Sequence, residues 1–167
     1  MKIPVFISCP TCLSNTQEEV RKMILRELER VGLEPRAIGR TDYPTELPLR
    51  EVLMLSKHCA GGVILGFEQF QAASGVLKRG TTEEQSITLP TPFPSAWNNL
   101  EAGILYALGL TLLVFAEPGI SGGVFDRGVT DVFIHDMPTL KMPKNKKISL
   151  LSVFQKWQAS VRSHYYR

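Results

Sequence analysis

The segment with the clearest potential for chemistry spans residues 95–109, where an aromatic ring, an amide and a carboxylate are separated by three and four residues, the spacing of neighbours on a helix. Trp97 lies four residues before Glu101 and Asn98 three residues before it, so in a helix the three side chains are neighbours. A carboxylate there can stabilise or attack the positive charge that develops at an anomeric carbon when a glycosidic bond breaks. The ring can stack on a base, and the amide can hold ribose hydroxyls. The spacing predicts a glycosidic site with Glu101 as its catalytic residue; the alternative is that Trp97 packs in the core and Glu101 is a solvated helix residue.

A second candidate is the glycine-rich loop over residues 118–131. Its glycines let backbone N–H groups approach a ligand closely, an arginine can neutralise a phosphate, and a phenylalanine can cover a base. We therefore expect this loop to contact the substrate through Gly122, Gly123, Phe125, Asp126 and Arg127. It is not a P-loop, because no Gly-Lys-Ser/Thr sequence follows. The alternative is a flexible turn.

Further candidates end or follow predicted strands. We expect Ser8, Cys9 and Pro10 to form a substrate-binding turn after the first strand. Asp42 follows the second strand and can contact ribose hydroxyls, and Phe67 ends the third strand and can stack on a ring. The Cys-x-x-Cys sequence that begins at Cys9 could instead form a redox pair, although this motif alone is a weak signal. We expect no metal, since a zinc site would lack a fourth ligand at plausible spacing.

The elements that must position these residues alternate between apolar strands and amphipathic helices. Near-continuous apolar runs predict buried strands, and apolar residues at helical spacing predict the helices that cover them. Thr16 and Glu19 predict a capping box at the start of the first helix. We expect strands over residues 3–8, 33–38, 61–67, 110–116 and 132–135, and helices over 16–31, 48–55, 95–108 and 148–163.

This βαβ alternation predicts an α/β fold with a single doubly wound, mainly parallel five-stranded sheet of the flavodoxin-like type. Ligands of such folds bind at the carboxyl ends of the strands, where the strand order reverses. The whole chain, residues 1–167, is expected to form one domain with an inserted loop at about 68–94. Polar loops this long tend to be lids or binding loops.

Composition narrows the class of protein. The net charge of +3 is too small to indicate nucleic-acid binding, and no apolar run is long enough to span a bilayer. The first residues do not have the pattern of a secretory signal peptide. Three cysteines, an odd number, do not make a disulfide framework. We expect a cytoplasmic protein that binds neither nucleic acid nor membrane.

The run from Trp97 to Glu101 resembles the Trp-x-x-x-Glu at the start of the third helix in Toll/interleukin-1 receptor (TIR) domains. The sequence from Glu101 to Gly109 also resembles the Glu-x-Gly-x-x-x-Ala-x-Gly pattern of nucleoside 2-deoxyribosyltransferases. The opening from Val5 to Pro10 is similar to the first strand and loop of both families. The insertion at 68–94 fits neither family closely, and the loop after the second strand lacks a clear match to that of a TIR domain.

Both resemblances imply a flavodoxin-like, TIR-like fold and a catalytic glutamate at position 101. The TIR resemblance implies cleavage of NAD as a substrate rather than a cofactor, self-association into a dimer or larger oligomer, and, in bacteria, a part in defence against phage. The second resemblance implies a nucleoside 2-deoxyribosyltransferase. A third alternative is a non-catalytic module that binds a nucleotide or a partner. We therefore predict an enzyme that breaks an N-glycosidic bond, with NAD as the favoured substrate.

Overall fold

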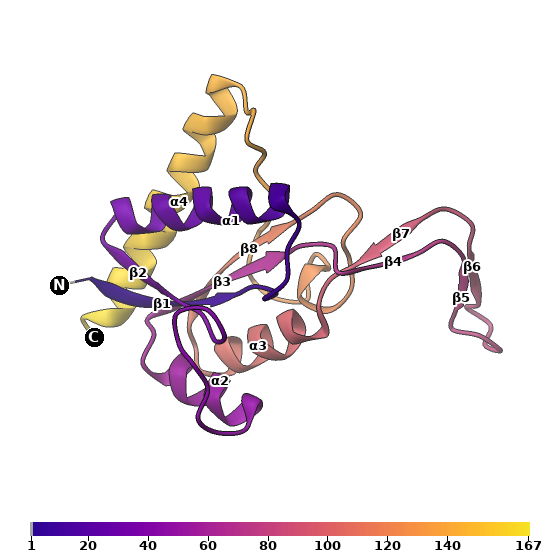
Figure 1. Cartoon of the computed structure of the whole chain (residues 1–167), viewed down its shortest axis with the longest axis horizontal. Helices are drawn as coiled ribbons and strands as arrows, with labels where there is room; N and C mark the ends of the chain where they lie inside the picture. Colours follow the sequence, from indigo (N-terminus) through magenta and orange to yellow (C-terminus); the bar gives the residue numbers. More distant parts are fainter. Residues whose placement is uncertain (1) are drawn as a thin grey trace.

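A computed structural model describes residues 2–167. Its centre is a parallel sheet in the order β2-β1-β3-β8-β9 (Figure 1). The strands are apolar because helices cover both of their faces. Their bounds are β1 Ile3–Ser8, β2 Leu33–Arg36, β3 Gly61–Gly66, β8 Thr111–Ala116 and β9 Ile134–Asp136. The predicted doubly wound, five-stranded α/β sheet of the flavodoxin-like type is confirmed.

Two pairs of helices cover the two faces of this sheet (Figure 1). On one face, α1 Asn15–Arg30 and α4 Lys144–Tyr165 pack on side chains such as Val5 and Phe115. On the other face, α2 Pro48–Lys57 and α3 Ala96–Ala107 pack on the alternate residues of the same strands, such as Phe6 and Val114. The successive side chains of a strand point to opposite faces, so the sheet separates two apolar clusters.

The start of α1 differs from its prediction. The N-cap is Ser14 rather than Thr16: the Ser14 hydroxyl accepts a hydrogen bond from the Gln17 backbone N–H, and the Gln17 side chain accepts one from the Ser14 N–H. This is also a capping box, but it lies two residues earlier, because glutamine at the third helical position serves as well as glutamate. The helix α4 likewise begins earlier than expected, at Lys144 rather than at residue 148.

The insertion is a folded β-ribbon rather than an irregular polar loop. Strand β4 Phe70–Ala72 pairs antiparallel with β7 Thr91–Phe93, and β5 Gly75–Leu77 pairs with β6 Gln85–Ile87. The ribbon projects away from the sheet, beyond its carboxyl edge (Figure 1). Its side chains are mostly exposed, so the ribbon adds little to the hydrophobic core.

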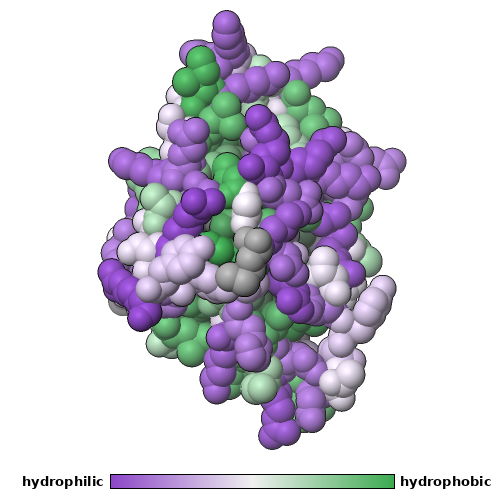
Figure 2. All heavy atoms as spheres, turned by 90° about the vertical axis from the view of Figure 1, so that its left-hand side faces the viewer, coloured by the Kyte–Doolittle hydropathy of each residue, from purple (hydrophilic) through white to green (hydrophobic). Residues whose placement is uncertain are grey.

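The strand order places a switch point at the carboxyl end of β1. The chain passes from β1 to β2 on one side and then returns to β3 on the other, so the connections on the two sides of β1 diverge. Figure 2 shows the end of the molecule opposite to this carboxyl edge, where the strands begin, and this face is largely hydrophilic. Within residues 2–167, every helix is too short or too polar to cross a membrane.

Candidate active site

A cavity of about 500 Å³ lies at the switch point, within the range of ligand pockets. Its walls are the loop after β1, the first turns of α2 and α3, and the base of the β-ribbon. The lining residues are Cys9, Pro10, Thr11, Cys12, Ile38, Pro48, Val52, Gln69, Ser95, Trp97, Asn98 and Glu101. The structure therefore brings together predicted site residues from two segments that are distant in the sequence: Cys9 and Pro10 from the first, and Trp97, Asn98 and Glu101 from the second.

Glu101 supplies the one carboxylate among these lining residues. It lies in the second turn of α3 and is only partly exposed. Burial raises the pKa of Glu101 from its ordinary value of 4.5 to about 7, although a hydrogen bond from the Ser8 hydroxyl lowers it. A desolvated carboxylate at a cavity wall has lost part of its hydration and interacts strongly with a nearby positive charge.

Trp97 lies one helical turn before Glu101 and lines the same cavity. The Ser95 side chain caps the helix by accepting a hydrogen bond from the Trp97 backbone N–H at 3.2 Å. The Trp97 residue is 43% exposed, so it is not part of the closed core, and its ring can meet a planar ligand group. The alternative of a core tryptophan does not fit this exposure.

Ser8 and Asn98 contact each other instead of facing open solvent. They are 0% and 1% exposed, and the Asn98 side-chain Nδ2 lies 2.8 Å from the Ser8 Oγ and 3.3 Å from the Ser8 carbonyl oxygen. The predicted direct contact of both residues with substrate therefore has little surface to support it. They form the floor beneath Glu101 rather than the open wall.

The loop after β1 is held by an arginine that the sequence analysis did not single out. Arg40 donates hydrogen bonds through Nη2 to the carbonyl oxygens of Pro10 at 2.9 Å and Thr11 at 3.0 Å. Its guanidinium also pairs with Glu18 of α1. Arg40 thus ties the cavity wall to α1. Because Arg40 lies 30 residues after Pro10, the local sequence has no signature of this contact.

Cys9 is not suited to redox or nucleophilic chemistry in this structure. Burial is the largest influence on its thiol and raises its pKa to about 12. Because the thiolate is the reactive form, Cys9 is a poor attacking group for the alternative of a Cys-x-x-Cys redox pair. Among residues 2–167, no three His, Cys, Asp or Glu side chains are arranged as metal ligands.

Two predicted aromatic contacts lie in the core instead of the cavity. Phe67 is 0% exposed and packs in the cluster beneath α1 and α4. Phe125 is also buried, and its ring lies so close to Gly66 that a Cβ on that glycine would be 2.5 Å from it. Neither ring has a face free for a base. The apolar character that suggested stacking is used for packing.

Two predicted polar contacts, Asp42 with ribose and Arg127 with phosphate, are not among the residues that line the cavity. Asp42 is bound by the Arg36 guanidinium, and this hydrogen bond holds the pKa of Asp42 below its usual range. Arg127 is exposed on the surface. These charges are placed by loop geometry that the sequence does not specify.

The glycine-rich loop is organised by contacts within itself and with α3. Gly122 N–H donates to the Asp126 carboxylate at 2.7 Å, and Asn99 of α3 accepts a hydrogen bond from the Val124 N–H at 2.8 Å. Gly123 has a φ of +60° and leaves no room for a side chain, since a Cβ would lie 2.1 Å from the Asn99 Oδ1. Gly123 therefore allows the loop to approach helix α3 closely.

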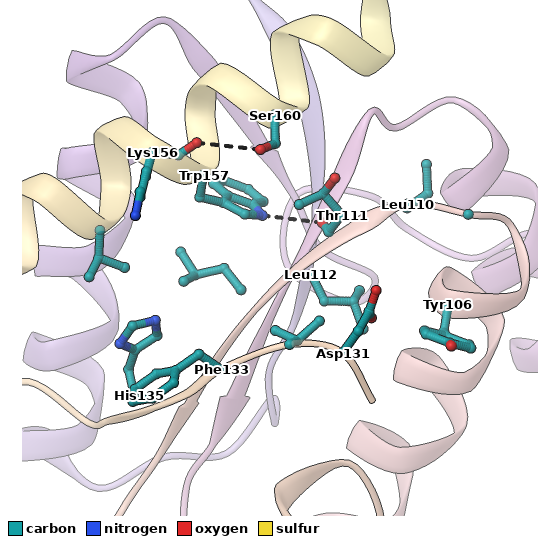
Figure 3. Close-up of a pocket in the computed structure, with 14 residues that line it drawn as sticks. Tyr106, Leu110, Thr111, Leu112, Asp131, Phe133, His135, Lys156, Trp157 and Ser160 are labelled. Atoms are coloured by element: carbon teal, nitrogen blue, oxygen red, sulfur yellow. Dashed lines mark hydrogen bonds between the residues drawn. The ribbon is translucent and has the colours of Figure 1, made fainter. Parts of the chain in front are cut away.

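A larger cavity of about 1010 Å³ lies between α4, the start of β8 and the segment before β9 (Figure 3). The Trp157 Nε1 donates a hydrogen bond to the Thr111 carbonyl oxygen at 3.2 Å and closes one side. The one carboxylate in this lining, Asp131, is exposed. This cavity adjoins the beginning of β8 and not the carboxyl edge of the sheet, so the smaller cavity is the better candidate for catalysis.

The fold and the smaller cavity together define a flavodoxin-like α/β protein with a partly buried carboxylate beside an accessible aromatic ring. Comparisons with protein-family models, with curated proteins and with solved structures found no match for this chain.

Proposed function

We propose that this protein cleaves the N-glycosidic bond of a nucleotide, with NAD as the favoured substrate. The observation that carries the proposal is the position of Glu101, whose partly buried carboxylate lines a ligand-sized cavity at the switch point of the sheet. In its ionised form this carboxylate can stabilise or trap the ribosyl cation that forms as the bond breaks. Trp97, on the same wall, can stack on the departing ring.

The composition of the cavity favours a substrate whose leaving group needs no proton. Besides Glu101, the titratable side chains of the lining are the thiols of Cys9 and Cys12, and the Cys9 thiol stays protonated because burial raises its pKa to about 12. In NAD the bond joins C1′ of ribose to a cationic pyridinium nitrogen. When the bond breaks, its electron pair stays on that nitrogen, which becomes neutral. Water then gives its hydroxyl to C1′ and releases a proton to the solvent.

The test is the release of nicotinamide from NAD, followed by liquid chromatography at high protein concentration. The wild type is expected to release nicotinamide, Glu101→Gln to release none, and Glu29→Gln, an exposed glutamate on α1, to match the wild type. Supplying a deoxynucleoside and a free base separates the alternatives, since only a deoxyribosyltransferase forms a new nucleoside. Nucleotide binding without turnover in the wild type would contradict the enzyme and favour a binding module.

We also propose that activity depends on self-association, as the TIR resemblance implies. Four large apolar side chains on α2 and the loop before it are about half exposed or more: Tyr43, Leu47, Leu49 and Met54. Exposed apolar side chains close together support a protein contact at this surface. Light scattering across a concentration series would detect a dimer or larger oligomer, and a strictly monomeric protein with full activity would contradict the proposal.

A further inference from the structure

The buried pair beneath Glu101 has a defined direction of hydrogen bonding. The Ser8 carbonyl oxygen can only accept, so the Asn98 atom that lies 3.3 Å from it must be the donor Nδ2. The same Nδ2 lies 2.8 Å from the Ser8 Oγ and donates to it as well. The amide nitrogen therefore faces Ser8, while the Asn98 Oδ1 has no hydrogen-bond partner. The Asn98 side chain is thus held in place through its amide nitrogen, which donates to Ser8.

This arrangement leaves one role for the Ser8 hydroxyl. Its oxygen accepts from Asn98, so its single proton is free to donate, and the acceptor that it meets is the Glu101 carboxylate. Ser8 ends strand β1, and Asn98 and Glu101 are three residues apart on α3, so the rigid sheet and helix fix all three groups. Ser8 and Asn98 are 0% and 1% exposed, so water does not compete for the hydrogen bonds between these two residues.

We propose that Ser8 and Asn98 are positioning residues: Asn98 directs the Ser8 hydroxyl proton at the Glu101 carboxylate, and so holds that carboxylate in the orientation and charge state that cleavage requires. The catalytic meaning of this inference rests on the function proposed above. The hydrogen-bond chain itself, from Asn98 to Ser8 to Glu101, does not.

Few other charges act on Glu101. Helix α2 contributes only Pro48 and Val52 to the cavity, and the base of the ribbon contributes the neutral Gln69. The loop after β1 contributes the thiols of Cys9 and Cys12. Arg21 and Arg40 act on Cys9 from behind this loop. The donor that opposes the effect of burial on Glu101 is therefore Ser8.

The test measures the titration of Glu101 directly, by NMR of protein labelled with ¹³C at the glutamate side-chain carboxyl carbon, in a Cys12→Ser background that removes the exposed thiol. Removing the hydroxyl in Ser8→Ala is expected to raise the pKa of Glu101 by about one unit above that of the wild type. The variant Asn98→Leu is expected to raise it in the same direction. An unchanged Glu101 titration in Ser8→Ala would overturn the proposal.

A matched pair guards against a change in the fold, since Ser8 is buried. Thr and Val have the same shape, and only Thr has a hydroxyl. The pKa of Glu101 is therefore expected to be about one unit lower in Ser8→Thr than in Ser8→Val. If the two variants titrate alike, the hydroxyl has no effect and the inference fails.

The pH profile of NAD cleavage gives a second readout. A shift of one unit lowers the ionised fraction at pH 7 about fivefold, so Ser8→Ala is expected to lose about that factor in kcat at pH 7 and to recover by pH 9. An equal loss at every pH would indicate a merely structural role and count against the proposal.

If the titration shifts but the wild type does not cleave NAD, the hydrogen-bond chain stands and the proposed function fails. If NAD is cleaved and the pKa of Glu101 does not shift, the proposed function stands and the hydrogen-bond chain fails.

Discussion

Replacing Glu101 by glutamine is expected to stabilise the protein at neutral and alkaline pH while it abolishes cleavage. Burial raises the pKa of Glu101 from 4.5 to about 7, so the folded state holds this proton more tightly than the unfolded state does. The stability associated with the protonated group is fully present below pH 4.5 and is lost as the pH rises through 7. The shift of about 2.5 units corresponds to about 3 kcal/mol, an upper bound because the cavity admits water to the carboxylate.

The assay is urea unfolding of the wild type and Glu101→Gln at several pH values between 4 and 8. Glutamine has nearly the same shape and no charge, so the variant should match the wild type near pH 4 and exceed it at pH 8 by up to about 3 kcal/mol. With ordinary urea slopes this is a midpoint shift of roughly 1–2 M. Glu29→Gln, exposed on α1, should stay within about 0.5 kcal/mol of the wild type. A difference between wild type and Glu101→Gln that does not change with pH would refute the reasoning.

Four further predictions concern the cavity and the elements around it. Trp97→Ala should raise the KM for NAD about tenfold through lost stacking without unfolding the protein. In contrast, Phe67→Ala should lower the free energy of unfolding by about 3–5 kcal/mol, because Phe67 is fully buried; both effects are read from kinetics and urea curves. Arg40→Ala should cost about 1–2 kcal/mol of stability and raise KM, since it frees the carbonyl of Pro10; an unchanged KM would contradict its role as a tether. Replacing residues 74–89 of the ribbon by Asn-Gly should change the free energy of unfolding by less than about 1 kcal/mol, because this segment is largely exposed; thermal unfolding checks it.

The fold could be predicted from the sequence because its signals are local. The apolar runs at 61–67 and 110–116 predicted two interior strands, and both are present with ends shifted by one residue. The helix expected over residues 95–108 is also present, as α3, which spans Ala96–Ala107. The ribbon was missed as structure because its strands are only three residues long and pair with each other, so no long apolar period marks them.

What the sequence by itself determined about the site is the helical spacing that puts Trp97, Asn98 and Glu101 within one turn of each other, since that geometry follows from 3.6 residues per turn. Only the tertiary structure decided which side chains the cavity uses. It buried Phe67, paired Asp42 with Arg36 and turned Asn98 toward Ser8, 90 residues away. Burial and hydrogen-bond partners depend on which segments meet across the sheet, and local patterns of residue types do not reveal which segments will meet.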